Sequence, residues 1–244
     1  MQSRVALVTG GGTGIGKAAS LLLASRGCKV GVNYSRSAKE AEETCAEIRK
    51  QGGTAIPLKG NVADDQQVRA LVKTCEEQFG GLDILVNNAG TTHFIDHANL
   101  DALTDMVWED IFSVNMRGSF YACRAAMPAL KKRHGCIVTV TSVAGLQGSG
   151  SSIPYAMSKA ALNCMTKSLA RAFAPEVRVN AVAPGPVLTR WLAPHPHMVE
   201  AAMGQTPMKR AATPDDIASA IVFLSLDNSL ITGQVLVVDG GRTM

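Results

Sequence analysis

Short runs of apolar residues alternate with helical patterns along the whole chain. Most of these runs are continuous rather than interrupted by polar residues, which is typical of strands that are covered on both faces. The runs predict strands at 4–9, 29–34, 54–59, 83–88, 136–141, 177–182 and 234–239. The segments between them predict helices at 14–26, 38–51, 64–79, 101–131 (broken near Asn115), 153–173 and 214–225. Strict alternation with short links predicts an α/β fold, with a doubly wound parallel sheet and helices on both faces.

One segment departs from this alternation. The stretch 184–212 is rich in Pro, Met and His and has no clear periodicity. A long irregular segment inside a compact domain is usually a functional lid. We therefore expect a single domain over residues 1–244, in which a mobile substrate lid at about 188–208 becomes ordered over bound ligands.

Composition and charge exclude several classes of protein. The net charge of +4 comes without a dense basic patch, so neither a nucleic acid nor a membrane surface is expected as a partner. No apolar run reaches the ~18 residues of a membrane span, and the chain enters its first strand without a signal peptide. The six cysteines form no CxxC pair, and the HPH sequence at 195–197 has no matching acid. We expect buried free thiols, no metal site and a cytoplasmic location.

A glycine-rich turn, TGGGTGIG at 9–16, follows the first strand and opens the first helix. Glycines there permit left-handed backbone and let N–H groups approach a pyrophosphate at the helix N-terminus. Two further turns, NNAG at 87–90 and APGPV at 183–187, end the fourth and sixth strands. Ligands of open α/β sheets bind at these carboxyl ends, although either turn alone is equally well a structural feature.

A tyrosine and a lysine stand four residues apart on the helix 153–173. Tyr155 and Lys159 therefore share one helix face. An ammonium beside a phenol stabilises the phenolate, so we expect the pKa of Tyr155 to be lowered toward the range that acid–base catalysis needs. Ser142 ends the fifth strand beside this helix, where its hydroxyl can hydrogen-bond a reacting oxygen.

The chain resembles the short-chain dehydrogenase/reductase superfamily, especially its 3-oxoacyl-[acyl-carrier-protein] reductase-like branch. The resemblance lies in the order and spacing of the three turns, Asn115, Ser142 and Tyr155-x-x-x-Lys159. The similarity covers essentially the whole chain. It implies a Rossmann-type domain with a seven-stranded parallel sheet that moves a hydride between a nicotinamide and a carbonyl or secondary alcohol. It also implies that Tyr155 exchanges the proton with the substrate oxygen. Asn115 would hold a water that relays protons to Lys159, and Lys159 would bind the ribose hydroxyls.

The end of the second strand favours NADP(H) over NAD(H). An acidic residue there would bind the ribose 2′-hydroxyl and repel a 2′-phosphate. This chain has Asn33 instead, followed by Ser35 and Arg36 as donors for a phosphate. Thr13 supplies no second positive charge, so we expect a modest preference with NAD(H) as the alternative. Asn61 stands where relatives usually have Asp, which predicts a weakened contact to the adenine amino group.

The complete set of expected cofactor contacts comes from these turns, the strand ends and the helix 153–173. It comprises Gly10, Gly12, Thr13, Gly14, Ile15, Asn33, Tyr34, Ser35, Arg36, Asn61, Val62, Asn88, Ala89, Gly90, Tyr155, Lys159, Pro184, Gly185, Val187 and Thr189.

The expected substrate walls, 144–152 and Val187–Met208, are apolar and offer no charge clamp. Their apolar members are Leu146, Leu188, Trp191, Leu192, Met198 and Met203. This composition favours a hydrophobic ketone or a 3-oxoacyl-type substrate. A true 3-oxoacyl-[acyl-carrier-protein] reductase is the alternative, with Arg133 as a docking base for the acidic carrier, although APEV at 174–177 supplies no second base. A catalytically silent nicotinamide-binding regulator is the alternative of another class, and the intact catalytic set argues against it.

The helices at 101–131 and 153–173 carry more apolar positions than one sheet face needs. By resemblance they pair across a two-fold axis, and the last strand with DGG at 239–241 forms a second interface. A homotetramer with 222 symmetry is therefore expected.

Overall fold

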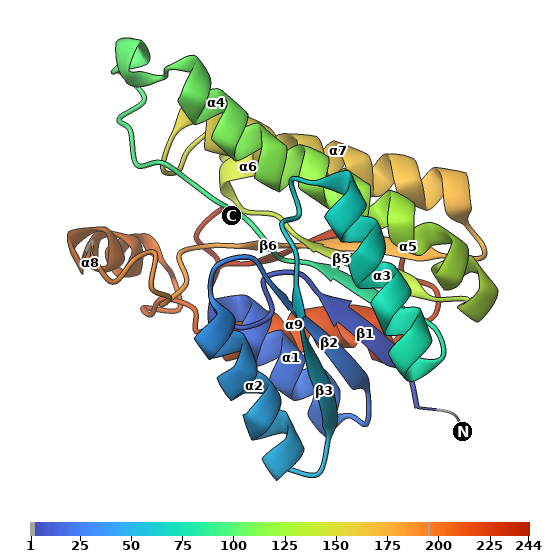
Figure 1. Cartoon of the computed structure of the whole chain (residues 1–244). Coiled ribbons are helices and arrows are strands. Elements are labelled where there is room, and N and C mark those ends of the chain that lie inside the picture. Colours follow the sequence, from blue (N-terminus) through green and yellow to red (C-terminus); the bar gives the residue numbers. More distant parts are fainter. Residues whose placement is uncertain (1–2, 195) are drawn as a thin grey trace.

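Seven parallel strands form one sheet in the order β3-β2-β1-β4-β5-β6-β7 (Figure 1). The computed structural model describes residues 3–194 and 196–244. The strands are β1 Val5–Val8, β2 Lys29–Tyr34, β3 Thr54–Lys59, β4 Ile84–Asn87, β5 Cys136–Val140, β6 Arg178–Pro184 and β7 Val235–Val238. Each matches a predicted strand to within a few residues. The order reverses between β1 and β4, which creates the crevice at which ligands of open α/β sheets bind.

Helices cover both faces of the sheet (Figure 1). One face carries α1 (Gly14–Ser25), α2 (Ala38–Lys50) and α9 (Pro214–Leu226). The other carries α3 (Asp65–Phe79), α4 (Asp105–Ile111), α5 (Ser119–Arg133) and α7 (Ile153–Phe173). A 3₁₀ turn at Leu100–Ala102 lies at the start of the helix predicted over 101–131, and a short helix, α6 at Ala144–Gln147, was not predicted. Among the described residues, no helix combines the length and apolar character that crossing a membrane requires.

The alternation of side chains along β1 explains why its apolar run is continuous. Ala6 and Val8 pack into the core beneath α1, α2 and α9, whereas Val5 and Leu7 pack into the core beneath α3 and α5. Because successive residues of a strand point to opposite faces, a strand with a core on each side must be apolar at every position.

The predicted break near Asn115 takes a different form in the structure. The chain passes from α4 through a π-helical segment, Phe112–Gly118, directly into α5. A π-helical segment widens the helix and frequently marks a functional site. Asn115 therefore lies in a widened part of a continuous helix and not at an interruption.

The segment after β6 is less irregular than its sequence suggested, because it contains α8 at Pro196–Gln205. The segment begins with a bridge between Val187 and Ala212, which ties both of its ends to each other. The predictions for the HPH sequence and for the side chain of Met198 lie outside the described residues.

Candidate active site

A cavity of about 820 Å³ lies at the carboxyl ends of the strands. Its size is within the range of small-molecule and cofactor sites. All three turns that follow β1, β4 and β6 line it, and so does every one of the twenty residues expected to bind the cofactor. Of the four expected catalytic residues, Ser142, Tyr155 and Lys159 line the cavity, and Asn115 lies behind its wall.

The glycine-rich turn is held by side chains from two neighbouring strands. Gly10 and Gly14 have φ of 61° and 52°, a left-handed conformation that favours glycine. A Cβ on Gly16 would lie 2.2 Å from the carbonyl oxygen of Gly10, so α1 can approach the turn only without a side chain there. Asn88 Nδ2 donates to the carbonyls of Thr9 and Gly10 at 2.9 and 3.1 Å. The turn is therefore rigidly shaped before any ligand binds.

Asn33 takes part in this bracing. Its side chain is only 2% exposed, its Oδ1 accepts a hydrogen bond from Gly10 N at 3.2 Å, and its Nδ2 donates to Gly60 O at 2.9 Å. The amide replaces an acid and also joins β2 to the glycine turn and to the end of β3. Ser35 and Arg36, which follow it, are exposed and line the cavity.

Asn61 lies beside this end of the cavity, in the turn before α3. Its Oδ1 already accepts a hydrogen bond from Ala63 N at 3.1 Å. A carboxamide oxygen has a second lone pair, so it can accept one further hydrogen bond. The geometry is compatible with the weakened adenine contact expected from the sequence.

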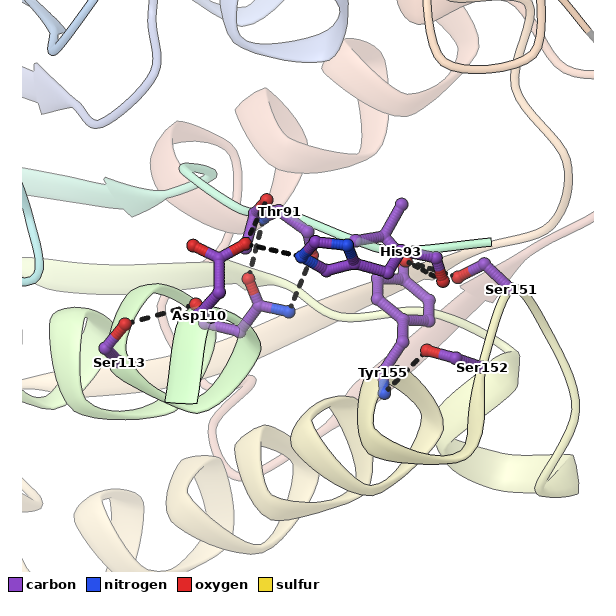
Figure 2. A network of polar contacts seen from close by, with 9 residues as sticks. Thr91, His93, Asp110, Ser113, Ser151, Ser152 and Tyr155 are labelled. Carbon is purple, nitrogen blue, oxygen red and sulfur yellow. Dashed lines mark hydrogen bonds and ion pairs between the residues drawn. The ribbon is translucent and has the colours of Figure 1, made fainter. Parts of the chain in front are cut away.

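The start of α7 fixes the position of Tyr155. Ser152 is the N-cap, and its hydroxyl accepts a hydrogen bond from Tyr155 N at 3.4 Å, as Figure 2 shows. Pro154 stands in the first turn, where its missing N–H leaves no hydrogen bond unmade. The rings of Tyr155 and Trp191 lie edge to face with centroids 6.5 Å apart, and Ser142 and Tyr155 both line the cavity.

Lys159 lies one turn farther along the same face of α7. Its side chain is 4% exposed, and Nζ donates to the carbonyl of Val140 at 3.0 Å. The same nitrogen lies 5.6 Å from the centroid of the Tyr155 ring. The hydroxyl pair of Ser142 and Tyr155 and a buried ammonium are thus brought to one wall of the cavity.

Burial dominates the ionisation of both groups in the protein alone. It raises the pKa of Tyr155 to about 12, although the hydrogen bond with Ser142 acts in the opposite direction. Burial also lowers the pKa of Lys159 to about 8. The expectation of a lowered tyrosine pKa is therefore wrong for the protein alone, because loss of hydration on burial is the largest influence on the phenol. At neutral pH Tyr155 is a neutral phenol that can donate a proton.

Asn115 is fully buried within the π-helical segment. Its Oδ1 accepts from Thr91 N at 2.8 Å, and its Nδ2 donates to Thr91 O at 3.1 Å and to Ser158 Oγ at 3.0 Å. Ser158 Oγ in turn donates to the carbonyl of Tyr155 at 2.7 Å. The side chain therefore joins the strand end after β4 to the first turn of α7.

Sequence reasoning missed a polar wall opposite the apolar one. Asp110 lines the cavity, and Figure 2 shows its carboxylate joined to His93 and Thr91. Asp110 Oδ2 lies 2.8 Å from His93 Nε2 and 3.5 Å from Thr91 Oγ1. Asp110 lies near the end of α4, and His93 lies in the loop after β4, so their contact could not be recognised from sequence spacing.

The second part of this polar wall joins two loops. Thr92 and Ser151 are hydrogen-bonded through their hydroxyls, and both line the cavity. By contrast, Leu146, Leu188 and Met203 are largely exposed and are not among the residues that line it. The apolar surface expected from the sequence is thus accompanied by polar groups that were not predicted. Trp191 and Leu192 line the cavity together with hydroxyl and carboxylate groups.

Comparison with known proteins finds relatives that are similar over almost the whole chain. Residues 10–243 match the family described as Enoyl-(Acyl carrier protein) reductase. The granaticin polyketide synthase putative ketoacyl reductase 2 of Streptomyces violaceoruber is 41% identical, over 98% of this chain and 96% of its own. The 3-oxoacyl-[acyl-carrier-protein] reductase FabG of Staphylococcus aureus is 38% identical, over 99% of each chain.

Solved structures are similar over the same length. A short-chain dehydrogenase from Burkholderia cenocepacia J2315 in complex with NADP superposes with a TM-score of 0.93 at 35% identity, covering 100% of this chain and 99% of that one. The sheet order, the three turns at its carboxyl ends and the extent of these matches lead to one assignment. The chain is an oxidoreductase that belongs to the short-chain dehydrogenase/reductase superfamily, in its 3-oxoacyl-[acyl-carrier-protein] reductase-like branch.

Proposed function

We propose that this chain transfers a hydride between NADP(H) and a carbonyl compound or secondary alcohol, with a hydrophobic ketone or 3-oxoacyl-type compound as substrate. The observation that carries the proposal is that Ser142, Tyr155 and Lys159 line the same cavity as the glycine-rich turn. Two hydroxyls that meet at one point suit a single carbonyl oxygen. The roles of the site residues and the single-domain organisation with a lid at about 188–208 are part of this proposal.

The residues present fit a dinucleotide. The left-handed glycines shape a turn at the N-terminus of α1, and a Cβ on Gly14 would reach only the methyl group of Thr189, 3.4 Å away. This turn can hold a pyrophosphate, and Ser35 and Arg36 can hold a phosphate on the adenosine ribose. When bound, the nicotinamide supplies the hydride to the carbonyl carbon or accepts it from the alcohol.

The residues of the chain manage the proton and the position of the oxygen. In reduction, the Tyr155 hydroxyl gives its proton to the substrate oxygen while Ser142 hydrogen-bonds the same oxygen. Lys159 offers its ammonium to the ribose hydroxyls and to the phenolate that Tyr155 becomes. The Asn115 amide makes three hydrogen bonds, two of them to the backbone of Thr91. These contacts support a role for Asn115 in positioning Thr91 at the wall of the cavity. The proton-relay water at Asn115 stays a prediction.

The pH dependence of the two directions tests these assignments. Tyr155 has a pKa of about 12 and stays protonated, whereas Lys159 loses its charge as pH rises through about 8. We expect kcat/KM for ketone reduction to be level from about pH 6 to 7.5 and to fall above about pH 8. Alcohol oxidation needs the phenolate, so its kcat/KM should rise above about pH 8. Reduction that accelerates through about pH 8 would contradict the assignment.

The substrate class needs a panel that separates the activities of the relatives. The panel would contain free hydrophobic ketones, a 3-oxoacyl thioester, the same acyl group on an acyl carrier protein and a 2-enoyl thioester, each with NADPH and NADH. We expect reduction of carbonyls and none of the carbon–carbon double bond, since the hydroxyl pair addresses an oxygen. Tight NADPH binding without turnover of any substrate would favour the silent regulator instead.

A true acyl-carrier-protein reductase remains the second candidate because of the relatives that carry this name. The proposed docking base Arg133 ends α5 and lies near Gly80 and Asp83, at the amino ends of the strands. Within one chain it is therefore at the opposite edge from the cavity. Docking at Arg133 would therefore not bring the carrier to the cavity of the same chain.

Assembly and location stay predictions. Large apolar side chains are exposed on α4 and α5, with Met106 at 74% and Phe120 at 42%, and on β7, with Leu236 at 39% and Val237 at 38%. Exposed apolar positions on two separate elements support the predicted homotetramer. All six cysteines are free, which agrees with a reducing cytoplasm.

The preference for NADP(H) is tested at Arg36. A charge-assisted contact between a guanidinium and a phosphate contributes on the order of 1.5–3 kcal/mol, which corresponds to about tenfold to hundredfold. We expect Arg36→Ala to raise KM for NADPH by at least about tenfold and to leave KM for NADH almost unchanged. Equal weakening of both cofactors, or a wild type that favours NADH, would show that Arg36 is only a solvated loop charge.

A further inference from the structure

The first residues of the proposed lid cross the cavity above the glycine-rich turn. Leu188 N donates to Ala212 O at 2.9 Å, which anchors the crossing where it begins. The methyl group of Thr189 then lies over Gly14, and Arg190 Nη1 reaches Ser37 Oγ at 3.4 Å. Ser37 precedes α2 and immediately follows Arg36. The contact therefore joins the segment after β6 to the loop after β2 across the mouth of the cavity.

Two arginines consequently line this part of the cavity. Arg36, Ser37 and Arg190 all line the cavity. In the part of the chain that the structure describes, neither arginine forms an ion pair, whereas Arg26 and Arg210 pair with Asp227 and Asp216. The only described hydrogen-bond partner of Arg190 is a neutral hydroxyl at the long limit of such a bond. Two unpaired cations beside one loop favour an anion with more than one negative charge.

We propose that Arg190 is a second determinant of cofactor choice, which binds the 2′-phosphate of NADP(H) together with Arg36. This inference rests on the proposed function, which assigns NADP(H) as the cofactor. The phosphate replaces Ser37 as the partner of Arg190 and makes a charge-assisted bond in place of a neutral one. Arg190 thereby supplies the second positive charge that Thr13 does not provide.

The position of Arg190 also connects cofactor choice to the substrate wall. Its neighbour Trp191 meets the ring of Tyr155 edge-on. A phosphate that holds Arg190 therefore also restrains the aromatic wall beside the proton donor. NADP(H) should fix the start of the lid in a way that NAD(H), which has no 2′-phosphate, does not.

Binding of two nucleotides without a nicotinamide tests the proposal. Calorimetry would compare adenosine 2′,5′-bisphosphate with 5′-AMP on wild type, Arg190→Ala, Arg190→Lys and the control Arg69→Ala, which removes an exposed arginine of α3 that pairs with Asp65. We expect Arg190→Ala to weaken the bisphosphate by about tenfold and 5′-AMP hardly at all. Arg190→Lys should restore part of the loss, and Arg69→Ala should change neither affinity.

Hydrogen exchange supplies a readout that does not depend on catalysis. In the wild type, the bisphosphate should protect amides at 188–194 more than 5′-AMP does, and this difference should vanish in Arg190→Ala. A wild type that binds the two nucleotides alike overturns both this inference and the NADP(H) assignment. A wild type that prefers the bisphosphate, with Arg190→Ala equally selective or weakened for both nucleotides, overturns the inference alone.

Discussion

Replacing Tyr155 by Phe is expected to lower kcat for carbonyl reduction by about a hundredfold to ten-thousandfold, the contribution typical of a general acid. The substitution removes one hydroxyl and keeps the half-buried ring, so the edge-on contact with Trp191 persists. The Kd of NADPH should stay near the wild-type value, because the glycine-rich turn, Arg36 and Lys159 are untouched. Stopped-flow reduction of a good ketone and calorimetry of NADPH binding measure the two quantities.

A second tyrosine provides the control for this experiment. Tyr121 lies on α5, packs beside Phe120 and Arg124, and does not line the cavity. Tyr121→Phe should therefore retain full turnover. Near-native turnover in Tyr155→Phe would remove the proton donor from the mechanism and shift attention to Ser142 or a water. Loss of NADPH binding in the same variant would instead indicate structural damage.

The sheet could be predicted from the sequence because a simple physical condition produces its pattern. A strand such as β1, with Val5 and Leu7 in one core and Ala6 and Val8 in the other, must be apolar throughout. The turns at the carboxyl ends were equally predictable, since glycine and asparagine are needed where the backbone is left-handed or must be braced. These two signals are local in sequence, and they placed the strand-end turns that line the cavity.

The features that sequence reasoning missed depend on distance and burial. The pair formed by His93 and Asp110 joins a loop to a helix 17 positions later, and the contact between Arg190 and Ser37 joins residues 153 positions apart. The pKa of Tyr155 was assigned the wrong direction because spacing along a helix reveals the neighbouring ammonium but not the depth of burial. Electrostatic properties of a site are set by the assembled cavity, not by the motif.

Burial of Lys159 leads to the second large effect, in which stability and activity should change in opposite directions. The folded protein holds this ammonium at 4% exposure, and its pKa falls from 10.5 to about 8. One pKa unit corresponds to about 1.4 kcal/mol, so the charged lysine costs the folded state on the order of 3 kcal/mol at neutral pH. Its hydrogen bond to the carbonyl of Val140 is already part of that balance, and losing it in a variant costs about 1–2 kcal/mol.

Lys159→Met should therefore be more stable and far less active than the wild type. We expect kcat and NADPH affinity each to fall by at least about tenfold, because the ribose hydroxyls and the phenolate lose their cation.

The free energy of unfolding at pH 7 should be higher in Lys159→Met than in the wild type by on the order of 1 kcal/mol, or about 2–4 °C in Tm for a chain of this size. Below about pH 8 both folded and unfolded chains hold the proton and the wild type bears the full cost. As pH rises from about 8 to 10.5 only the unfolded chain stays protonated, so wild-type stability rises and the advantage of the variant disappears. Calorimetric unfolding of both proteins at pH 7 and near pH 10.5 measures this convergence. A variant that is less stable at pH 7 would show that the lysine contributes to the fold rather than straining it for catalysis.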